Sequence, residues 1–190
     1  MKKQELRAHY KHLRLSLAPG ELDERSNAVC LRLFTQFQLS EKTVSMFLPI
    51  ERLKEINTYL ILEKGISLDV RIALPKMNPD TNSLRHFLFE NHSQLEINAL
   101  GIPEPKRGKS VKIKDLDIVL VPLLAFDKNG HRVGYGKGYY DKLLRKCSPT
   151  AIFIGLSLFD EAAEIDDINQ HDIPLHYCIT PNNLIRFNEG

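Results

Sequence analysis

The 190-residue sequence contains no tryptophan, only three cysteines, little net charge and no long apolar run. The cysteines, Cys30, Cys147 and Cys178, are odd in number and too far apart for a paired metal site, which excludes a disulfide framework and indicates reduced thiols. Cys30 falls on the apolar face of a predicted helix, so we expect it to be buried and structural. The net charge of +2, with Lys and Arg scattered, argues against nucleic acid as a partner.

No apolar run approaches the roughly 18 residues that cross a bilayer, so we expect no membrane partner. The charged N-terminal residues 1–5 lack the apolar core of a signal peptide, and we expect a cytoplasmic protein. Apolar residues make up 43% and charged residues 26%, as in ordinary globular proteins, and the length suits a single domain over residues 1–190.

Apolar spacing along the chain predicts an α/β protein. Helices are expected at residues 2–17, 21–38, 58–64 and 139–146, and strands at residues 43–48, 70–74, 84–89, 117–122, 152–158 and 178–180. Pro49 and Pro75 should end the first two strands, residues 90–114 should form a long ordered loop, and residues 178–180 should be the last strand. Residues 117–122 do not alternate, which is typical of a strand covered on both faces. The predicted fold is a single-domain open, mostly parallel sheet with helices on both faces.

A glycine-rich segment at residues 132–141, RVGYGKGYYD, follows the most strand-like run and precedes a predicted helix. Glycines allow the backbone to approach a ligand closely, and a helix start offers unpaired N–H groups and a positive dipole end, which suits phosphate oxygens. Arg132 and Lys137 add positive charge, and Asp141 is a hard oxygen ligand of the kind that Mg²⁺ prefers. The segment fits neither the P-loop nor the dinucleotide fingerprint, and a glycine turn with a capping role is the structural alternative.

The same segment carries a resemblance to a known family. Residues 121–127, Gly130 and residues 132–141 resemble the signature of the 5-formyltetrahydrofolate cyclo-ligase family, also called methenyltetrahydrofolate synthetase. Weaker similarity extends over residues 3–7, 55–58, 101–105 and 171–175. The sequence departs from the commonest form at Val133, at Lys137 and at the pair before Glu55, where a glycine is frequent.

The resemblance implies an enzyme whose substrates are ATP and 5-formyltetrahydrofolate and whose products are ADP, phosphate and 5,10-methenyltetrahydrofolate, with Mg²⁺ as cofactor. Phosphorylation of the formyl oxygen would make it a leaving group, and N10 of the folate would then attack the activated carbon. Such a transfer needs positioning and charge neutralisation rather than a protein nucleophile. A monomer or a weak dimer is expected.

The resemblance also implies a role for each matching residue. The ATP-binding residues would be Lys3, Arg7, Arg132, Val133, Gly134, Tyr135, Gly136, Lys137, Gly138, Tyr139 and Tyr140. Folate would contact Ile50, Glu55, Tyr135 and Tyr139. Asp141 and Asp172 would hold the metal, and Arg132, Lys137 and Tyr140 would act in catalysis.

Plainer interpretations stay open for several of these residues. Lys3 is an ordinary exposed charge unless it shares an anion with Arg7, one helical turn away. Asp172 could simply end a loop, and Glu55 could cap the helix that begins near residue 58. Two other functions also stay open: a sugar-phosphate isomerase that holds a single phosphate, and a non-catalytic folate or nucleotide-binding regulator.

Overall fold

The computed structural model describes residues 1–160 and 164–187 and contains a central sheet of eight strands. The strand order is β12-β11-β10-β7-β1-β2-β3-β6, and the five strands from β11 to β2 run parallel. The three outer pairings, β12 with β11, β2 with β3 and β3 with β6, are antiparallel. The strands are β1 Thr43–Ser45, β2 Arg71–Asn78, β3 Ser83–Leu88, β6 Ser110–Val111, β7 Ile118–Pro122, β10 Ile152–Leu156, β11 Tyr177–Ile179 and β12 Leu184–Arg186. The prediction of an α/β fold with a mostly parallel sheet is confirmed.

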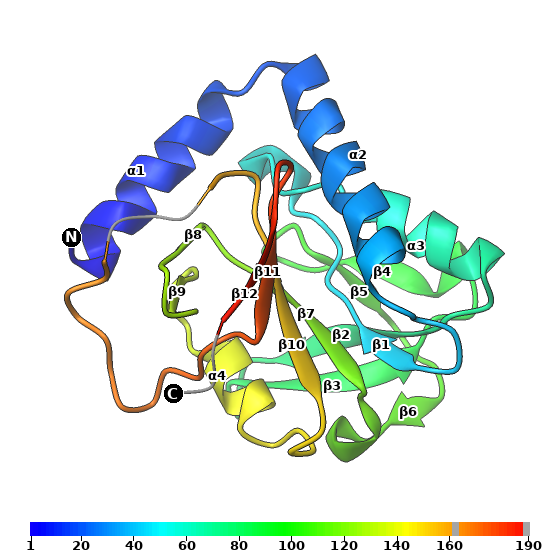
Figure 1. Cartoon of the computed structure of the whole chain (residues 1–190). Coiled ribbons are helices and arrows are strands. Elements are labelled where there is room, and N and C mark those ends of the chain that lie inside the picture. The colour runs from blue at the N-terminus through cyan, green and yellow to red at the C-terminus, as the bar shows by residue number, and fades with distance from the viewer. Residues whose placement is uncertain (161–163, 188–190) are drawn as a thin grey trace.

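The described residues form four α-helices, of which α2, α3 and α4 pack on the sheet, and two small strand pairs lie beside it (Figure 1). The helices are α1 Lys3–Ser16, α2 Pro19–Gln36, α3 Tyr59–Ser67 and α4 Tyr139–Leu144. The small pairs are β4 Leu95–Ile97 with β5 Pro103–Pro105, and β8 Ala125–Phe126 with β9 Arg132–Val133. Residues 1–160 and 164–187 also contain three short 3₁₀ helices: η1 Glu51–Leu53, η2 His92–Gln94 and η3 Ile113–Asp115. None of the helices in the described part of the chain has the length and apolar character that a membrane crossing requires.

The core lies on both faces of the sheet because its central strand β7 is apolar at every position before Pro122. Ile118 and Leu120 belong to the cluster that packs beneath α2 and α3. Val119 and Val121 point the other way, into the cluster that includes α4. This confirms that β7 is covered on both faces and that helices lie on both sides of the sheet. Cys30 is 8% exposed within the first cluster, as expected, and all three cysteines are free.

Helix α1 packs outside these two core clusters. Its first turn is held by Glu5, whose side chain accepts a 3.0 Å hydrogen bond from the main-chain N–H of Lys2. The helix makes its main contacts with β8, β9 and η1 (Figure 1). Its apolar residue Leu6, 2% exposed, packs with Ala125, Val133 and Ile165. The N-terminal helix is therefore fixed against the strands that lead into the glycine-rich segment.

The structure corrects several predicted strand boundaries. Strand β2 does not end at Pro75 but continues to Asn78, because β1 stops at Ser45, opposite Ala73, and leaves Pro75 with no strand on that side to require its N–H. The predicted loop at residues 90–114 contains β4, β5, β6 and two 3₁₀ helices, and these elements are too short to show a period. The predicted last strand is followed by β12.

Candidate active site

A cavity of about 470 Å³ opens at the carboxyl ends of the parallel strands β1, β2 and β7. Phe47 and Leu48 follow β1, Pro75 and Met77 lie in β2, and Pro122 ends β7, and all five line the cavity. In open α/β sheets ligands gather at this edge, because loops from neighbouring strands meet there. The glycine-rich segment and the loop that carries Glu55 open into this same cavity.

The glycine-rich segment lines one side of the cavity, between β9 and α4. Gly136 and Gly138 have φ of +86° and +69°, a backbone conformation that residues with a side chain rarely adopt. Two side chains hold the segment through its carbonyl groups: Arg7 Nε donates to Gly134 O over 2.8 Å, and Asn82 Nδ2 donates to Lys137 O over 2.8 Å. Among the described residues, no acceptor takes the main-chain N–H groups of residues 134–140. These N–H groups are therefore available to an anionic ligand.

Helix α4 is shorter than the sequence indicated. It spans six residues, Tyr139–Leu144, rather than reaching residue 146. So short a helix contributes little dipole, and the local N–H groups and side-chain charges matter more for an anion here.

Positive charge gathers where α1 meets the glycine-rich segment. Arg132 is 9% exposed; its Nη2 donates to Asp141 Oδ1 over 2.6 Å, and its Nη1 donates to the carbonyl of Ile173. Burial lowers the pKa of the Arg132 guanidinium, and Asp141 opposes that shift. Lys3 Nζ forms an ion pair with Asp172. Burial raises the pKa of Asp172, but hydrogen bonds from Lys3 and the Asn169 main chain, with the charges of Lys3 and Arg132, bring it below its usual value.

Asp141 and Asp172 both line the cavity and have the donor chemistry that Mg²⁺ requires. Each uses one oxygen within the protein: Asp141 Oδ1 also accepts from Ile173 N, and Asp172 Oδ2 also accepts from Asn169 N over 2.7 Å. In the described ranges, the second oxygen of each carboxylate has no hydrogen-bond donor. The described residues include no cluster of three or more metal-binding side chains. Two carboxylates suit Mg²⁺, which often binds one or two carboxylates together with substrate phosphates and water.

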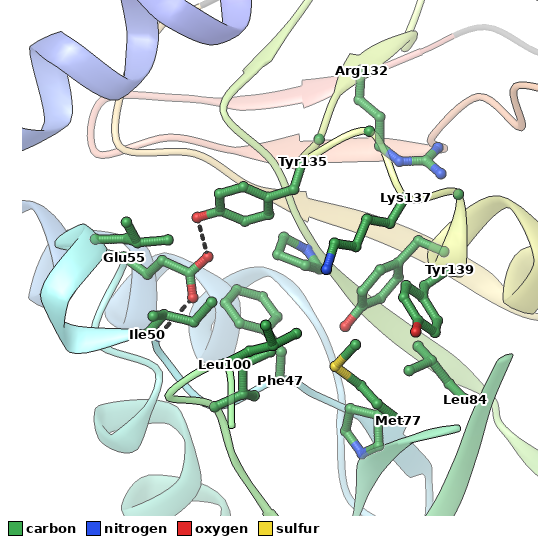
Figure 2. A pocket seen from close by; sticks show the side chains of 18 of the residues that line it. Phe47, Ile50, Glu55, Met77, Leu84, Leu100, Arg132, Tyr135, Lys137 and Tyr139 are labelled. Atoms are coloured by element: carbon green, nitrogen blue, oxygen red, sulfur yellow. Dashed lines mark hydrogen bonds between the residues drawn. The ribbon is translucent and has the colours of Figure 1, made fainter. Parts of the chain in front are cut away.

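The opposite end of the cavity is formed by Glu55, Tyr135 and apolar side chains (Figure 2). Glu55 is 6% exposed, and its two oxygens accept from the Tyr135 hydroxyl and from Ile50 N, the latter over 2.8 Å. Burial and the charge of Glu55 raise the pKa of Tyr135, so the phenol stays protonated. Burial and Glu55 likewise raise the pKa of Tyr140. Figure 2 shows Ile50, Phe47 and Leu100 as an apolar wall beside Glu55, whereas Met77 and Leu84 lie farther along the cavity, near Tyr139.

The capping role considered for Glu55 is wrong, because neither of its hydrogen bonds goes to α3. The N-cap of α3 is Thr58, and the N–H of Tyr59 is taken by Asn57 Oδ1 at 3.2 Å. Lys54 has φ +45° in the turn before Glu55, a left-handed conformation that a glycine would adopt without strain.

All but one of the predicted site residues line the cavity. The exception is Val133, which is fully buried and packs with Leu6, Ala125 and Ile165 beneath the glycine-rich segment. The residues that do line it are Lys3, Arg7, Ile50, Glu55, Arg132, Gly134, Tyr135, Gly136, Lys137, Gly138, Tyr139, Tyr140, Asp141 and Asp172.

The sequence analysis missed several residues at or beside the cavity. Lys11 lies on α1, with its Nζ 5.5 Å from the centre of the Tyr135 ring, and Arg14 contacts the Tyr135 hydroxyl. Both continue the helical spacing of Lys3 and Arg7 along one side of α1, and this spacing could have identified them. Glu104 also lines the cavity and lies in residues 101–105, a stretch that the resemblance covers without giving it a role. Arg52 lines the cavity too and had no recognisable sequence signal.

Comparisons with known proteins agree over nearly the whole chain. Residues 1–181 match the family model described as the 5-formyltetrahydrofolate cyclo-ligase family. The chain is 28% identical to 5-formyltetrahydrofolate cyclo-ligase of Escherichia coli K12, over 90% of this chain and 96% of that protein. It is 27% identical to a probable 5-formyltetrahydrofolate cyclo-ligase of Schizosaccharomyces pombe, over 98% of each chain. The solved structure of Aquifex aeolicus 5,10-methenyltetrahydrofolate synthetase superposes with a TM-score of 0.79 at 29% identity, covering 100% of this chain and 95% of the other.

Proposed function

The chain belongs to the 5-formyltetrahydrofolate cyclo-ligase family, and from this premise we propose that it converts 5-formyltetrahydrofolate and ATP to 5,10-methenyltetrahydrofolate, ADP and phosphate in a Mg²⁺-dependent reaction. One observation carries the proposal: a single cavity has an end rich in cations and free N–H groups and an end with a carboxylate and an apolar wall. The first end suits a polyphosphate and the second suits a reduced pterin ring.

The chemistry requires the γ-phosphate of ATP to reach the formyl oxygen. The P–O bond to ADP breaks as a P–O bond to the formyl oxygen forms, and the formyl carbon becomes open to attack by N10. The N10 lone pair forms the new C–N bond, N10 loses its proton to solvent, and the C–O bond breaks to release phosphate. The phosphoryl transfer moves charge between oxygens and ring closure needs no protein nucleophile, so catalysis depends mainly on positioning and charge neutralisation.

ATP is proposed to bind along the glycine-rich segment. The N–H groups of residues 134–140 would donate to phosphate oxygens, and Lys3, Arg7 and Arg132 would neutralise their charge. Lys137 is exposed at the cavity and is proposed to stabilise charge on the transferred phosphoryl group together with Arg132. Tyr140, held protonated by burial, would supply a neutral donor at the same place. Val133 would support the segment from beneath.

Folate is proposed to bind with its donor edge toward Glu55. A reduced pterin ring presents adjacent N–H groups, and a carboxylate accepts two at once. Ile50 fixes the carboxylate through its main-chain N–H and adds an apolar contact. Tyr135 and Tyr139 would border the ring between the carboxylate and the phosphate end.

Asp141 and Asp172 are the proposed Mg²⁺ ligands, through the oxygens that lack a protein donor. When bound, the ion would neutralise charge on the phosphates. The residues of the chain perform the remaining tasks: Arg132 and Lys3 hold the two carboxylates in place, and the glycine-rich segment positions the phosphates.

The family assignment removes the sugar-phosphate isomerase as an explanation. A non-catalytic binder is disfavoured because its site would not need two carboxylates beside the phosphate end.

An absorbance assay for methenyltetrahydrofolate tests the function. We expect product only when 5-formyltetrahydrofolate, ATP and Mg²⁺ are all present, with one ADP formed per methenyl group. Binding of both substrates without product would establish the non-catalytic binder, and product formed at the same rate without ATP would disprove the phosphorylation mechanism.

A further inference from the structure

Arg14 is a buried arginine immediately behind the carboxylate end of the cavity. It is 5% exposed. Its Nη1 donates to the Tyr135 hydroxyl over 3.0 Å and lies 3.8 Å from Glu55 Oε1, and its Nη2 donates to Leu123 O over 2.7 Å. The guanidinium is therefore fixed at two points, by a phenol and by a carbonyl at the end of β7.

The hydrogen bond from Arg14 to Tyr135 fixes the direction of the hydrogen bond between Tyr135 and Glu55. A guanidinium has only donors, so the phenolic oxygen of Tyr135 must accept from Arg14. The one phenolic proton is then left for Glu55 Oε1, to which Tyr135 donates. Ile50 N donates to the other oxygen, Oε2. Both oxygens of Glu55 thus accept hydrogen bonds from protein donors, and the Arg14 guanidinium lies beside one of them.

A buried arginine at this place is costly. Its Nε is buried and has no hydrogen-bond partner among the described residues. Leaving a buried donor unpaired destabilises the fold, so its presence beside the cavity requires an explanation. The contacts from Arg14 to Tyr135 and Leu123 span more than a hundred residues of sequence, and its ion pair with Glu55 joins α1 to the loop after β1.

We propose that Arg14 is a positioning residue: it holds Tyr135 and Glu55 so that the Glu55 carboxylate faces the ligand only as a hydrogen-bond acceptor. The cavity then selects a ring with an N–H donor edge over a ring without one. This inference rests on the proposed function, because it assigns the donor edge to the reduced pterin ring of the folate substrate. Arg14 does not line the main cavity, so its effect passes through Tyr135 and Glu55.

The test compares two ligands on Arg14→Met, which keeps an apolar stem but removes the guanidinium. The ligands are 5-formyltetrahydrofolate and an analogue in which a methyl group replaces the ring 2-amino group. For the parent, we expect the analogue to bind about tenfold to a hundredfold more weakly, as for a lost charge-assisted hydrogen bond. For Arg14→Met, we expect folate affinity to fall about tenfold and the discrimination between the ligands to shrink, with ATP affinity unchanged.

Two further variants separate positioning from stability. Arg14→Lys keeps the charge without the fork and should restore part of the discrimination. Arg25→Met is the matched control. Arg25 donates to Leu158 O over 2.8 Å and pairs with Glu21 over 2.6 Å, and it does not line the cavity. This variant should therefore retain the parental discrimination. If Arg14→Met is not recovered folded, Arg14→Gln, which keeps a donor but no charge, provides the same comparison.

The outcomes are distinct. Parental discrimination in a folded Arg14 variant overturns the inference, as does an equal loss of folate and ATP affinity, which would mark a purely structural arginine. If the parent turns over folate but does not distinguish the two ligands, the inference fails while the proposed function stands. If the parent neither binds nor converts folate, the proposed function fails and the inference fails with it.

Discussion

Arg7 on α1 donates its Nε to the carbonyl of Gly134 over 2.8 Å, so the N-terminal helix is tied directly to the glycine-rich segment. A Cβ added at Gly136 would lie 3.1 Å from Arg7 Nη2, which shows how closely the two elements approach. Arg7 therefore has two roles, fixing the segment and adding charge to the proposed phosphate site.

We expect Arg7→Ala to weaken ATP binding about tenfold or more, because charge-assisted contacts of this kind are worth about 1.5–3 kcal/mol. Folate affinity should change much less. Calorimetric titration with each ligand measures both effects. Arg32→Ala is the control, because Arg32 also donates to main-chain carbonyls, those of Thr180 and Pro181, but does not line the cavity. Parental ATP affinity in Arg7→Ala would mean that α1 is only a scaffold.

A second prediction separates the two explanations for Asp172, metal ligand and counter-ion of Lys3. If it is a metal ligand, Asp172→Asn should raise the Mg²⁺ concentration needed for half-maximal turnover, whereas Lys3→Ala should raise mainly the ATP requirement. The measurement is turnover across a Mg²⁺ titration at fixed ATP, repeated across ATP at fixed Mg²⁺. An unchanged Mg²⁺ requirement in Asp172→Asn would leave Asp172 as the partner of Lys3 alone.

The third prediction concerns Asp141, which is bonded to Arg132 at 2.6 Å. Asp141→Asn preserves the shape of the side chain but removes the charge opposite a buried guanidinium. We expect a large fall in turnover together with a loss of unfolding free energy of about 1–3 kcal/mol. Thermal unfolding and the Mg²⁺ titration on the same variant measure the two effects, and full activity would contradict the metal-ligand assignment.

The fourth prediction concerns Glu55. Glu55→Gln can accept at only one position, so folate affinity should fall about tenfold while ATP affinity stays near the parent's. Glu21→Gln, at a half-buried position of α2 outside the cavity, is the control for removing a carboxylate that pairs with an arginine. Lower thermal stability with parental folate affinity would limit Glu55 to holding the loop after β1.

The parts of the fold that local sequence determines were predictable. The apolar run of β7 and the helical spacing of α2 depend on the residues of each segment, and both appear where expected. The glycine-rich segment was equally visible, because glycine spacing and nearby charges are local features. Strands β4, β5, β6, β8, β9 and β12 were missed because strands of two or three residues carry no measurable period. Strands β1 and β11 are equally short but were predicted, because they overlap apolar or β-branched runs.

The contacts that organise the cavity were not predictable for the same reason. Arg14 is a basic residue on a helix, which ordinarily indicates an exposed side chain, and its burial depends on Tyr135 and Leu123 far along the chain. Asn82 lies in the turn between β2 and β3, and nothing local indicates that it bonds to Lys137. The two charges of the pair Arg132 and Asp141 were recognised, but their 2.6 Å contact required the folded chain.

Away from the cavity, a buried histidine makes the free energy of unfolding depend on pH. His86 on β3 is 1% exposed; its Nε2 lies 2.9 Å from Ser45 Oγ, and its Nδ1 has no hydrogen-bond partner among the described residues. Burial lowers the pKa of His86 from 6.5 to about 4. Because the folded pKa is below the unfolded value, the native state binds fewer protons than the unfolded state. The stability contributed by the neutral imidazole of His86 is therefore fully present at pH values above its pKa in the unfolded chain. It is lost as pH falls toward about 4.

We expect the parent to lose up to about 3 kcal/mol of unfolding free energy through His86 as pH falls across this window. His86→Gln can keep the hydrogen bond to Ser45 but cannot titrate, so its stability should fall less over the same window. Urea unfolding at several pH values on both proteins measures the difference, and His12→Gln, at an exposed position of α1, serves as the control. Parallel loss of stability in parent and His86→Gln would show that other groups govern acid unfolding, since the only change between the two proteins is the buried imidazole.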